Sequence, residues 1–397
     1  MMSEDRLTII GGTVVTEAGS IEKGYIQIEA GKIVSFGKWE EGVQKDGDET
    51  ITLPPGCWIL PGMIDVHIHG ADGADTMDAS EESLERIARA LPREGSTAFL
   101  ATTMTQAPAA IEQALQVAGA WMEAGVVSGG AECLGIHLEG PFISAKRAGA
   151  QPLEHIHPPD VELFRRWQAL SGNHIRLVTL APEEPGGMEL IAHLRGTGVI
   201  ASIGHSDASY VQVVEAIEAG ASHITHLFNG MRGFHHRDPG VVGAAWLREE
   251  LGVEIIPDGI HSSEDSLLLT YKQVGPERLV LITDAMRAKC LHDGTYDLGG
   301  QRVTVGGREA RLSDGTLAGS ILPMHEGALR MQRVAACSWD EIARMTALNA
   351  ARELGISDRK GSIAVGKDAD LAVWGANGEI VLTICRGKVA YRRPASA

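Results

Sequence analysis

Eight short apolar segments recur along the middle of the chain, and this recurrence constrains the fold more than any other feature of the sequence. Most of the stretches between them have helical spacing of apolar residues, with Ser or Asp at the start and Gly near the end. Near-continuous apolar strands that alternate with helices indicate a parallel sheet covered on both faces. Eight of them predict an α/β fold, a (β/α)8 TIM-like barrel, with a doubly wound open sheet as the alternative. The segments are residues 58–70, 96–103, 133–141, 175–182, 199–206, 223–229, 253–261 and 279–285.

The two ends of the chain have a different pattern. Residues 1–56 contain short alternating strands separated by Gly-containing turns, and residues 357–397 show the same pattern. Together they predict one small, discontinuous β-sandwich domain built from both termini, which leaves residues 57–356 for the barrel. Residues 294–320 are Gly-rich and strand-like, so we expect a hairpin excursion after the eighth barrel strand.

Polar side chains gather where the predicted barrel strands end, which is where reactive groups lie in such barrels. His67 and His69 follow the first strand, on the same side of an extended chain because side chains alternate. Imidazole and carboxylate ligands suit borderline divalent ions such as Zn²⁺, Fe²⁺, Mn²⁺ or Co²⁺. We therefore predict a site for one or two divalent ions from residues at the ends of strands one, three, five and six: His67, His69, Glu139, His205 and His226.

Three polar residues in or after the predicted barrel strands are interpreted separately. Asp284 ends the eighth apolar strand, and a carboxylate beside a divalent ion can take a proton from an attacking water and return it to a leaving group. His137 shares a side of its strand with Glu139 and is interpreted as a structural or supporting residue. His223 precedes the strand end at His226 and receives no role.

Charge and cysteine content narrow the class of partner. Lys and Arg number 35 against 52 Asp and Glu, a net charge of −17, which argues against nucleic acid or an anionic membrane as a partner. An anionic substrate would need a local cationic pocket. The five cysteines are far apart, which argues against disulfides and favours a reducing compartment. With no signal-peptide pattern and no apolar run near ~18 residues, we expect a cytoplasmic protein.

The motifs at the strand ends resemble a known family. HIHG, HLEGPF, GHS, THLFN and TDA are similar to motifs of the amidohydrolase superfamily. GAQP, HLFNGM…HHRDPG, PDGIH and TLAGS resemble, more narrowly, the N-acetylglucosamine-6-phosphate deacetylases. The resemblance runs over nearly the whole chain. It implies a metal-dependent homodimer that hydrolyses N-acetylglucosamine 6-phosphate to glucosamine 6-phosphate and acetate, in amino-sugar catabolism and cell-wall sugar recycling.

The resemblance also implies roles for individual residues. Glu139, His205 and His226 would hold one ion, and Asp284 would be the catalytic acid and base. The presence of both His67 and His69 makes a second ion, shared with Glu139 and Asp284, an expectation. Arg237 and His261 would form the cationic pocket for the phosphate, with Arg237 reaching the neighbouring subunit's site. The implied substrate-binding residues are Ala150, Gln151, Asn229, Gly230, Arg237, His261, Leu317, Ala318 and Gly319.

One position departs from the family pattern. Gln151 stands where many relatives carry a His that is thought to polarise the acetamide carbonyl, and an amide can donate a hydrogen bond but carries no charge.

Two alternative functions remain open: another amidohydrolase, such as a dihydroorotase or an aminohydrolase, and a barrel that has lost its metals and serves as a scaffold. Many cyclic-amide hydrolases use a carbamylated Lys, and the third strand ends in Glu139 instead.

Overall fold

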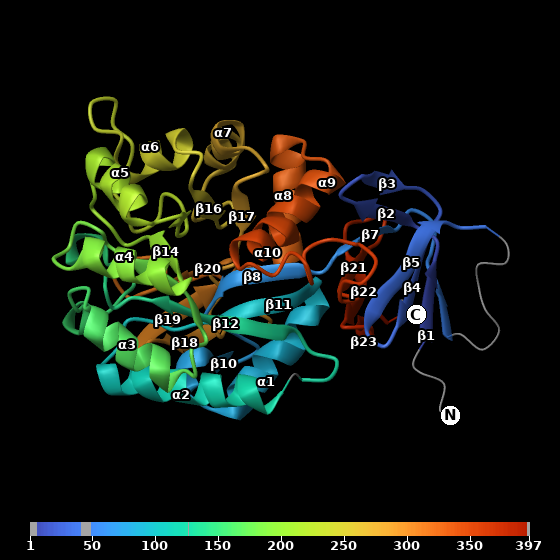
Figure 1. The fold of residues 1–397 in the computed structure, drawn as a ribbon, viewed down its shortest axis with the longest axis horizontal. Helices are drawn as coiled ribbons and strands as arrows, with labels where there is room; N and C mark the ends of the chain where they lie inside the picture. Colours follow the sequence, from blue (N-terminus) through green and yellow to red (C-terminus); the bar gives the residue numbers. More distant parts are fainter. Residues whose placement is uncertain (1–5, 41–48, 126, 395–397) are drawn as a thin grey trace.

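The computed structural model describes residues 6–40, 49–125 and 127–394. Parts of the two predicted terminal β segments, residues 1–5, 41–48 and 395–397, lie outside the described residues. The centre of the molecule is an eight-stranded parallel sheet whose strands follow one another in chain order (Figure 1). They are β8 (Met63–Ile68), β11 (Ser96–Thr102), β12 (Glu132–Glu139), β13 (Ile175–Leu180), β14 (Ile200–Ile203), β15 (His223–Ile224), β16 (Gly252–Ile255) and β17 (Leu279–Leu281).

The sheet closes into a barrel just beyond the end of β17. Ile68 forms a parallel bridge with Ala285. The backbone N–H of Asp284 donates to the carbonyl of His67 at 2.8 Å, and that of His69 donates to Ala285 at 2.9 Å. The open sheet considered from the sequence is thereby excluded, and the predicted barrel is confirmed.

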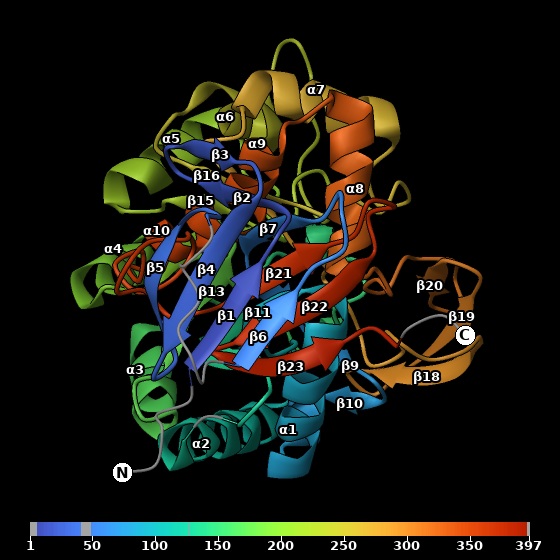
Figure 2. The same ribbon diagram turned by 90° about the vertical axis from the view of Figure 1, so that its right-hand side faces the viewer.

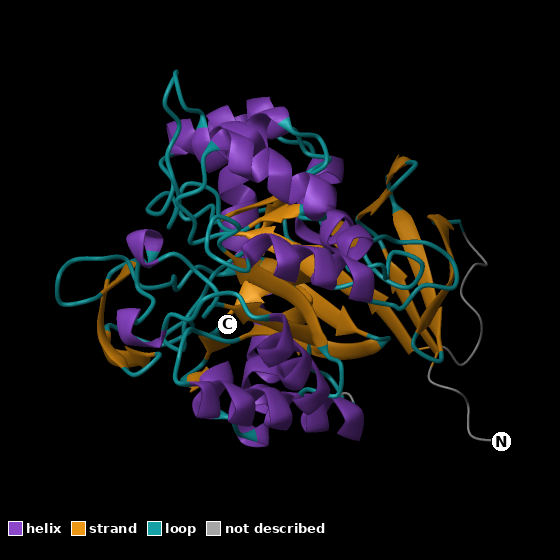
Figure 3. Ribbon diagram, turned by 60° about the vertical axis from the view of Figure 1, so that its left-hand side comes forward, coloured by secondary structure: helices purple, strands orange, loops and turns teal. Residues whose placement is uncertain are grey.

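Helices cover the outside of the barrel (Figure 3). Their starts follow the sequence signals: Ser80, Asp160, Ser209, Ser263 and Ser338 each accept a backbone N–H at a helix N-terminus. The α-helices are α1 (Glu81–Ala90), α2 (Pro108–Ala124), α3 (Val161–Leu170), α4 (Gly187–Thr197), α5 (Tyr210–Ala219), α6 (Gly240–Leu247), α7 (Glu264–Val274), α8 (Met324–Ala335), α9 (Trp339–Ala343) and α10 (Asn349–Glu353). Shorter turns are η1 (Thr76–Asp78), η2 (Leu91–Glu94), η3 (Ala145–Arg147), η4 (Leu153–His155) and the π-helical η5 (Arg344–Leu348).

Strands from both ends of the chain form two further sheets that face each other beside the barrel (Figure 2). Ile9, Ile26, Ile59, Leu371 and Ile384 are buried in the apolar core that these strands share, as a β-sandwich requires. One sheet has the order β5–β4–β1–β6 and the other β23–β22–β21–β7–β2–β3. The strands are β1 (Arg6–Ile10), β2 (Thr13–Thr16), β3 (Gly19–Ile21), β4 (Gly24–Glu29), β5 (Lys32–Lys38), β6 (Glu49–Thr52), β7 (Trp58–Pro61), β21 (Leu371–Trp374), β22 (Ile380–Cys385) and β23 (Lys388–Arg392).

The apolar segment 58–70 is two strands, where the sequence pattern predicted one. Its first part, β7, pairs with β2 and β21 in the terminal sheet, and only β8 enters the barrel. Gly62 separates them, and a Cβ at this position would lie 2.2 Å from Oγ1 of Thr97. The chain therefore passes between the two layers at a point where no side chain fits.

The predicted excursion after the eighth strand is a three-stranded antiparallel sheet, seen at the right of Figure 2. It consists of β18 (Gly294–Leu298), β19 (Gln301–Gly306) and β20 (Glu309–Arg311). Leu298, Val303 and Val305 pack with Met104 and Met286. Nε2 of Gln301 donates to the carbonyl of Ala150 at 2.5 Å, which ties this sheet to the loop after β12. A smaller hairpin, β9 (Gly70–Ala71) and β10 (Ala74–Asp75), follows β8.

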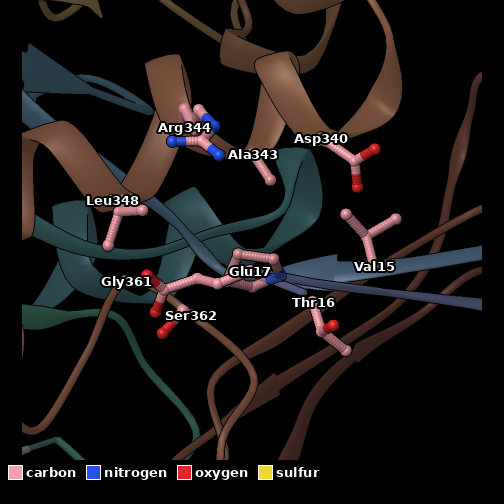
Figure 4. A pocket seen from close by; sticks show the side chains of 10 residues that line it. Val15, Thr16, Glu17, Asp340, Ala343, Arg344, Leu348, Gly361 and Ser362 are labelled. Atoms are coloured by element: carbon pink, nitrogen blue, oxygen red, sulfur yellow. The ribbon is translucent and has the colours of Figure 1, made fainter. Parts of the chain in front are cut away.

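A small pocket lies between β2 and the helical segment formed by α9 and η5 (Figure 4). Its volume of about 20 Å³ is room for one water molecule. This pocket is accordingly a packing gap between the terminal sheet and the helices. In the described part of the chain, no helix has the length and apolar character needed to cross a membrane.

Candidate active site

His67 and His69 point together into the mouth of the barrel. His67 is fully buried at the end of β8, and its Nε2 lies 3.4 Å from Oε1 of Glu139 and 3.5 Å from Oδ1 of Asp284. Nε2 of His69 lies 3.2 Å from Oε2 of Glu139 and 3.3 Å from Oδ1 of Asp284. The two rings therefore face the same pair of carboxylates.

Glu139, the last residue of β12, stands at the centre of the cluster. Its Oε1 lies 3.1 Å from Nε2 of His205 and 3.1 Å from Nε2 of His226. Each set, His67 with His69 and Glu139, and Glu139 with His205 and His226, brings its ligand atoms within 4.8 Å of one another. All five side chains are buried. Two potential cation sites thus share one carboxylate.

The nitrogen atoms in this cluster fit a cation better than they fit one another. Nε2 of His205 and Nε2 of His226 are only 3.1 Å apart, so at most one of them can carry a proton toward the other. Nε2 of His67 is buried and has no hydrogen-bond partner among the described residues, although it faces two carboxylates. Lone pairs directed at a shared point are what a divalent ion needs.

Three residues of the cluster adopt strained backbone conformations. His205, His226 and Asp284 have φ angles of 48°, 28° and 47°, in the left-handed region that residues other than glycine seldom adopt. Such conformations cost about 1–3 kcal/mol each and persist only where the surroundings impose them. Each one follows the end of a strand. His205 and His226 turn their side chains toward Glu139, and Asp284 turns its side chain toward His67 and His69.

Burial and charge compensation determine the pKa values of the cluster. Burial alone would raise the pKa of Glu139, but His67, His205 and His226 hold the pKa of this carboxyl well below its usual range. Burial opposes protonation of His69, yet its hydrogen bonds to Asp284 and Glu139 outweigh burial and raise its pKa to about 10. Two carboxylates buried against the same rings require compensating positive charge, which protons or metal ions can supply.

Sequence reasoning missed Glu254, a fully buried carboxylate on β16. Its Oε2 lies 2.9 Å from Nδ1 of His67, and its Oε1 lies 3.1 Å from Nε2 of His223. Nδ1 of His223 lies 2.8 Å from Glu353, at the outer end of this chain of contacts. Burial opposes protonation of His223, but the two glutamates raise its pKa to about 10. His223, to which the sequence analysis gave no role, therefore helps to hold Glu254 in place. The sequence signal for Glu254 itself was a single Glu within an apolar strand.

His137 lies next to His67, with ring centroids 4.4 Å apart. Its Nε2 is 2.7 Å from Oγ1 of Thr179. Burial, followed by the charge of His67, lowers the pKa of His137 well below its usual range. A neutral ring packed under the ligands matches its interpretation as a supporting residue.

A pocket of about 360 Å³ opens above the cluster. Its wall includes most of the substrate-binding residues that the resemblance implied: Ala150, Gln151, Asn229, Gly230, His261, Leu317 and Gly319. Ala318 is buried in the apolar core of the β18–β20 sheet. Arg237 is exposed, with Nη1 2.8 Å from Nε2 of His236, and does not line this pocket.

Two polar residues of the pocket wall are held by neighbours. Gln151 donates from Nε2 to Oε2 of Glu139 at 2.8 Å, and its Oε1 accepts the backbone N–H of Thr105 at 2.9 Å. Nδ1 of His261 lies 2.7 Å from Oδ2 of Asp258. Burial opposes protonation of His261, but this contact with Asp258 raises its pKa. Gln151 thus supports Glu139, and Asp258 favours the protonated form of His261 in the other part of the wall.

Comparisons with known proteins agree with this geometry. The sequence profile of the amidohydrolase family matches residues 58–390. The N-acetylglucosamine-6-phosphate deacetylase of Bacillus subtilis is 54% identical over 381 residues, covering 95% of each chain, and that of Lysinibacillus sphaericus is 46% identical over 364 residues, covering 91% of this chain and 92% of the other. The structure of a mutant N-acetyl-D-glucosamine-6-phosphate deacetylase from Mycobacterium smegmatis, in complex with N-acetyl-D-glucosamine-6-phosphate, is 31% identical and superposes with a TM-score of 0.90, covering 98% of this chain and 99% of the other. This chain therefore belongs to the amidohydrolase family and, within it, to the N-acetylglucosamine-6-phosphate deacetylases.

Proposed function

We propose that the protein hydrolyses the acetamide of N-acetylglucosamine 6-phosphate, giving glucosamine 6-phosphate and acetate, in amino-sugar catabolism and cell-wall sugar recycling. One observation carries the proposal: two cation-binding groups that share Glu139 lie beside Asp284 on the floor of a pocket of about 360 Å³. Pockets of about 300–1,000 Å³ suit small ligands. An amide bond placed there would contact a metal centre and a carboxylate together.

The residues that would hold metal ions are those that converge on Glu139. Glu139, His205 and His226 form the first group, and His67 and His69 with Glu139 and Asp284 form the second. We propose one or two divalent ions per chain, of Zn, Fe, Mn or Co, because imidazole and carboxylate ligands suit these ions. A bound divalent ion supplies Lewis acidity toward the attacking water and the amide carbonyl.

Asp284 is the proposed catalytic acid and base. Burial opposes ionisation of Asp284, but the charge of His67 and the hydrogen bond and charge of His69 outweigh burial and lower the pKa of this carboxyl. The carboxylate form is therefore available to accept a proton. Asp284 takes the proton from the attacking water and passes it to the departing amine. The second transfer matters because an unprotonated amine is a poor leaving group.

Gln151 has a different proposed part from the His found in many relatives. Its Nε2 is engaged with Glu139, and an amide nitrogen carries a second N–H that the acetamide oxygen could accept. The sugar itself would contact Ala150, Asn229, Gly230 and the Leu317–Gly319 segment, and the phosphate would lie near His261. Of this last segment, Ala318 contributes only through its backbone, since its side chain is buried.

A homodimer is the proposed assembly, with Arg237 contributed across the interface. The loop that leads into α6 projects beyond the helices at the top left of Figure 1. Val211, Phe234 and Leu247, on α5, this loop and α6, are 63%, 51% and 65% exposed, a set of apolar side chains that a second copy could cover. Arg237 lies on the same loop.

We also propose that the enzyme is cytoplasmic and has no nucleic-acid or membrane partner, in line with its net charge of −17.

Acetate release from a panel of sugars tests the proposal. The panel is N-acetylglucosamine 6-phosphate, its galacto epimer and unphosphorylated N-acetylglucosamine, each assayed with the metal-loaded protein. Fast release from the first sugar is expected. No release from any of them with Zn²⁺, Fe²⁺, Mn²⁺ or Co²⁺ added would favour the scaffold alternative, and turnover of a cyclic amide such as dihydroorotate instead would favour another amidohydrolase.

A further inference from the structure

The pocket above the His and Glu cluster around Glu139 has a cationic residue that the family motifs did not indicate. Arg311, at the end of β20, lines this pocket together with Thr316, Leu317 and His261. Among the pocket-lining residues in the described part of the chain, it is the only Lys or Arg. In a chain of net charge −17, this guanidinium is the permanent positive charge available to an anion inside the pocket.

The guanidinium of Arg311 is held with part of its donor set unused. Nε donates to Oε2 of Glu309 at 2.7 Å, and Nη1 donates to the carbonyl of Gly315 at 2.6 Å. A guanidinium has five N–H donors, and Nη2 has no acceptor among the described residues. The side chain is 41% exposed. The two hydrogen bonds therefore fix the direction of the guanidinium and leave the N–H groups of Nη2 free to bind a ligand.

The backbone around Arg311 joins it to the reacting end of the site. Arg311 forms an antiparallel bridge with Leu317, and the N–H of Ala318 donates to the carbonyl of Ala310 at 3.0 Å. Three residues beyond Leu317, the N–H of Ser320 donates to the carbonyl of Asp284 at 2.7 Å. The positive charge of Arg311 also acts to lower the pKa of His261, which places the two groups within electrostatic range.

We propose that Arg311 binds the phosphate of the substrate, as a recognition residue supplied by the chain's own β18–β20 sheet. The proposal rests on the proposed function, because it assigns the phosphate-bearing end of that substrate to this wall of the pocket. A planar guanidinium edge matches two phosphate oxygens, and His261, from the loop after β16, adds a donor to the same pocket. Arg237 is exposed outside this pocket, so Arg311 is the charged group that a single chain provides there.

Two substitutions of Arg311 and one control test the proposal. Arg311→Gln removes the charge, Arg311→Lys keeps the charge without the fork, and Arg308→Gln removes an exposed Arg of the same sheet that pairs with Glu326 and does not line the pocket. We expect Arg311→Gln to lower the ratio of kcat/KM for the phosphorylated to the unphosphorylated sugar by about 10- to 100-fold, as for the loss of a charged hydrogen bond. The change should lie mainly in KM, with Arg311→Lys intermediate and Arg308→Gln like the parent chain.

Inorganic phosphate, titrated calorimetrically into the metal-loaded protein, keeps the test independent of turnover. The dissociation constant for phosphate should rise about tenfold or more in Arg311→Gln, with the melting temperature recorded to verify folding. An unchanged selectivity ratio, or an unchanged phosphate affinity, overturns the assignment of Arg311. If the parent chain releases no acetate but its phosphate affinity still depends on Arg311, the proposed function fails while this assignment stands.

Discussion

Oε2 of Glu254 lies 2.9 Å from Nδ1 of His67, and both side chains are fully buried. With Nδ1 held in this way, Nε2 of His67 is the nitrogen directed at Glu139 and Asp284. A carboxylate that accepts one ring N–H fixes the tautomer and orientation of a histidine ligand. The backbone N–H of His226 also donates to Oε2 of Glu254, at 3.1 Å, so one carboxylate contacts residues of both groups that could hold a cation.

Glu254→Gln should weaken metal binding by about 10- to 100-fold, because the loss of an orienting carboxylate typically has this effect. Metal titration of the chelator-treated protein, monitored by calorimetry, measures the change. Glu353→Gln is the matched control at the outer, 23% exposed end of the same chain of contacts, and its effect should be smaller. Parent-like metal affinity in a folded Glu254→Gln protein would show that His67 needs no such support.

Asp284→Asn keeps the shape of the side chain and removes the base. We expect kcat to fall by at least about 100-fold, the usual contribution of a general acid and base, while the melting temperature shows an intact fold. Asp265→Asn, an exposed Asp in the first turn of α7, serves as the control. Near-normal turnover in Asp284→Asn would remove this residue from the mechanism.

The metal content should be about two ions per chain, because the two groups around Glu139 each offer three ligands. Removal of the ions by a chelator should lower the melting temperature, since a ligand at 1,000 times its Kd stabilises the folded state by about 4 kcal/mol. Elemental analysis of the parent chain and of a His67→Asn/His69→Asn variant checks the count. One ion in both proteins would contradict the second site.

Glu132→Gln should reduce stability at neutral pH. Oε1 of Glu132 lies 2.8 Å from Arg359 and Oε2 lies 2.8 Å from Lys360. Burial opposes ionisation, but these partners lower the pKa of Glu132 below its ordinary value of 4.5. A lowered pKa in the folded state gives stability that is complete above pH 4.5 and is lost as the pH falls through the lowered value.

Urea unfolding at pH 7 should therefore show a loss of about 3 kcal/mol for Glu132→Gln, the lower end for breaking a buried pair. Below pH 4.5 the stability of the variant should depend less steeply on pH than that of the parent chain. Glu162→Gln, which removes an exposed pair with Arg165, should cost less than about 1 kcal/mol. Equal pH dependence in the parent and the Glu132→Gln protein would mean that this pair does not stabilise the fold.

If Arg237 reaches the partner's site, Arg237→Ala should lower kcat/KM for the phosphorylated sugar. The decrease should correspond to a loss of about 2–3 kcal/mol of transition-state stabilisation. Mixed chains decide where it acts: unfolding and refolding Arg237→Ala with Asp284→Asn should restore about a quarter of the parent activity, because half of the dimers are then mixed and each has one intact site. No activity beyond that of the separate variants would place Arg237 outside the neighbouring site.

The strand pattern predicted the barrel because each parallel strand is buried on both faces and is therefore a short apolar run. The same reasoning placed His67, Glu139, His205 and Asp284 at one end of the barrel, where the structure brings them together. The split at Gly62 was missed because β7 and β8 are both apolar, and only pairing with strands from the two termini distinguishes them.

The sequence did not predict the roles of residues whose partners lie far away along the chain. Glu254 and His223 are ordinary polar residues in strands until the barrel places them against His67. Arg311 lies in a segment whose Gly-rich pattern indicated a hairpin but not what the hairpin faces. Arg237 matched a family motif, yet a motif does not state which chain's pocket the side chain enters.

The seam that closes the barrel is made by residues of the site itself. The N–H of Asp284 donates to the carbonyl of His67, and that of His69 donates to Ala285, so the first and last barrel strands meet through the groups that surround Glu139. No shorter, incomplete barrel can assemble this arrangement. During synthesis, a nascent chain therefore cannot bring Asp284 beside His67 and His69 until its eighth strand has docked. Under the role proposed for Asp284, hydrolytic activity then reports complete folding of the barrel.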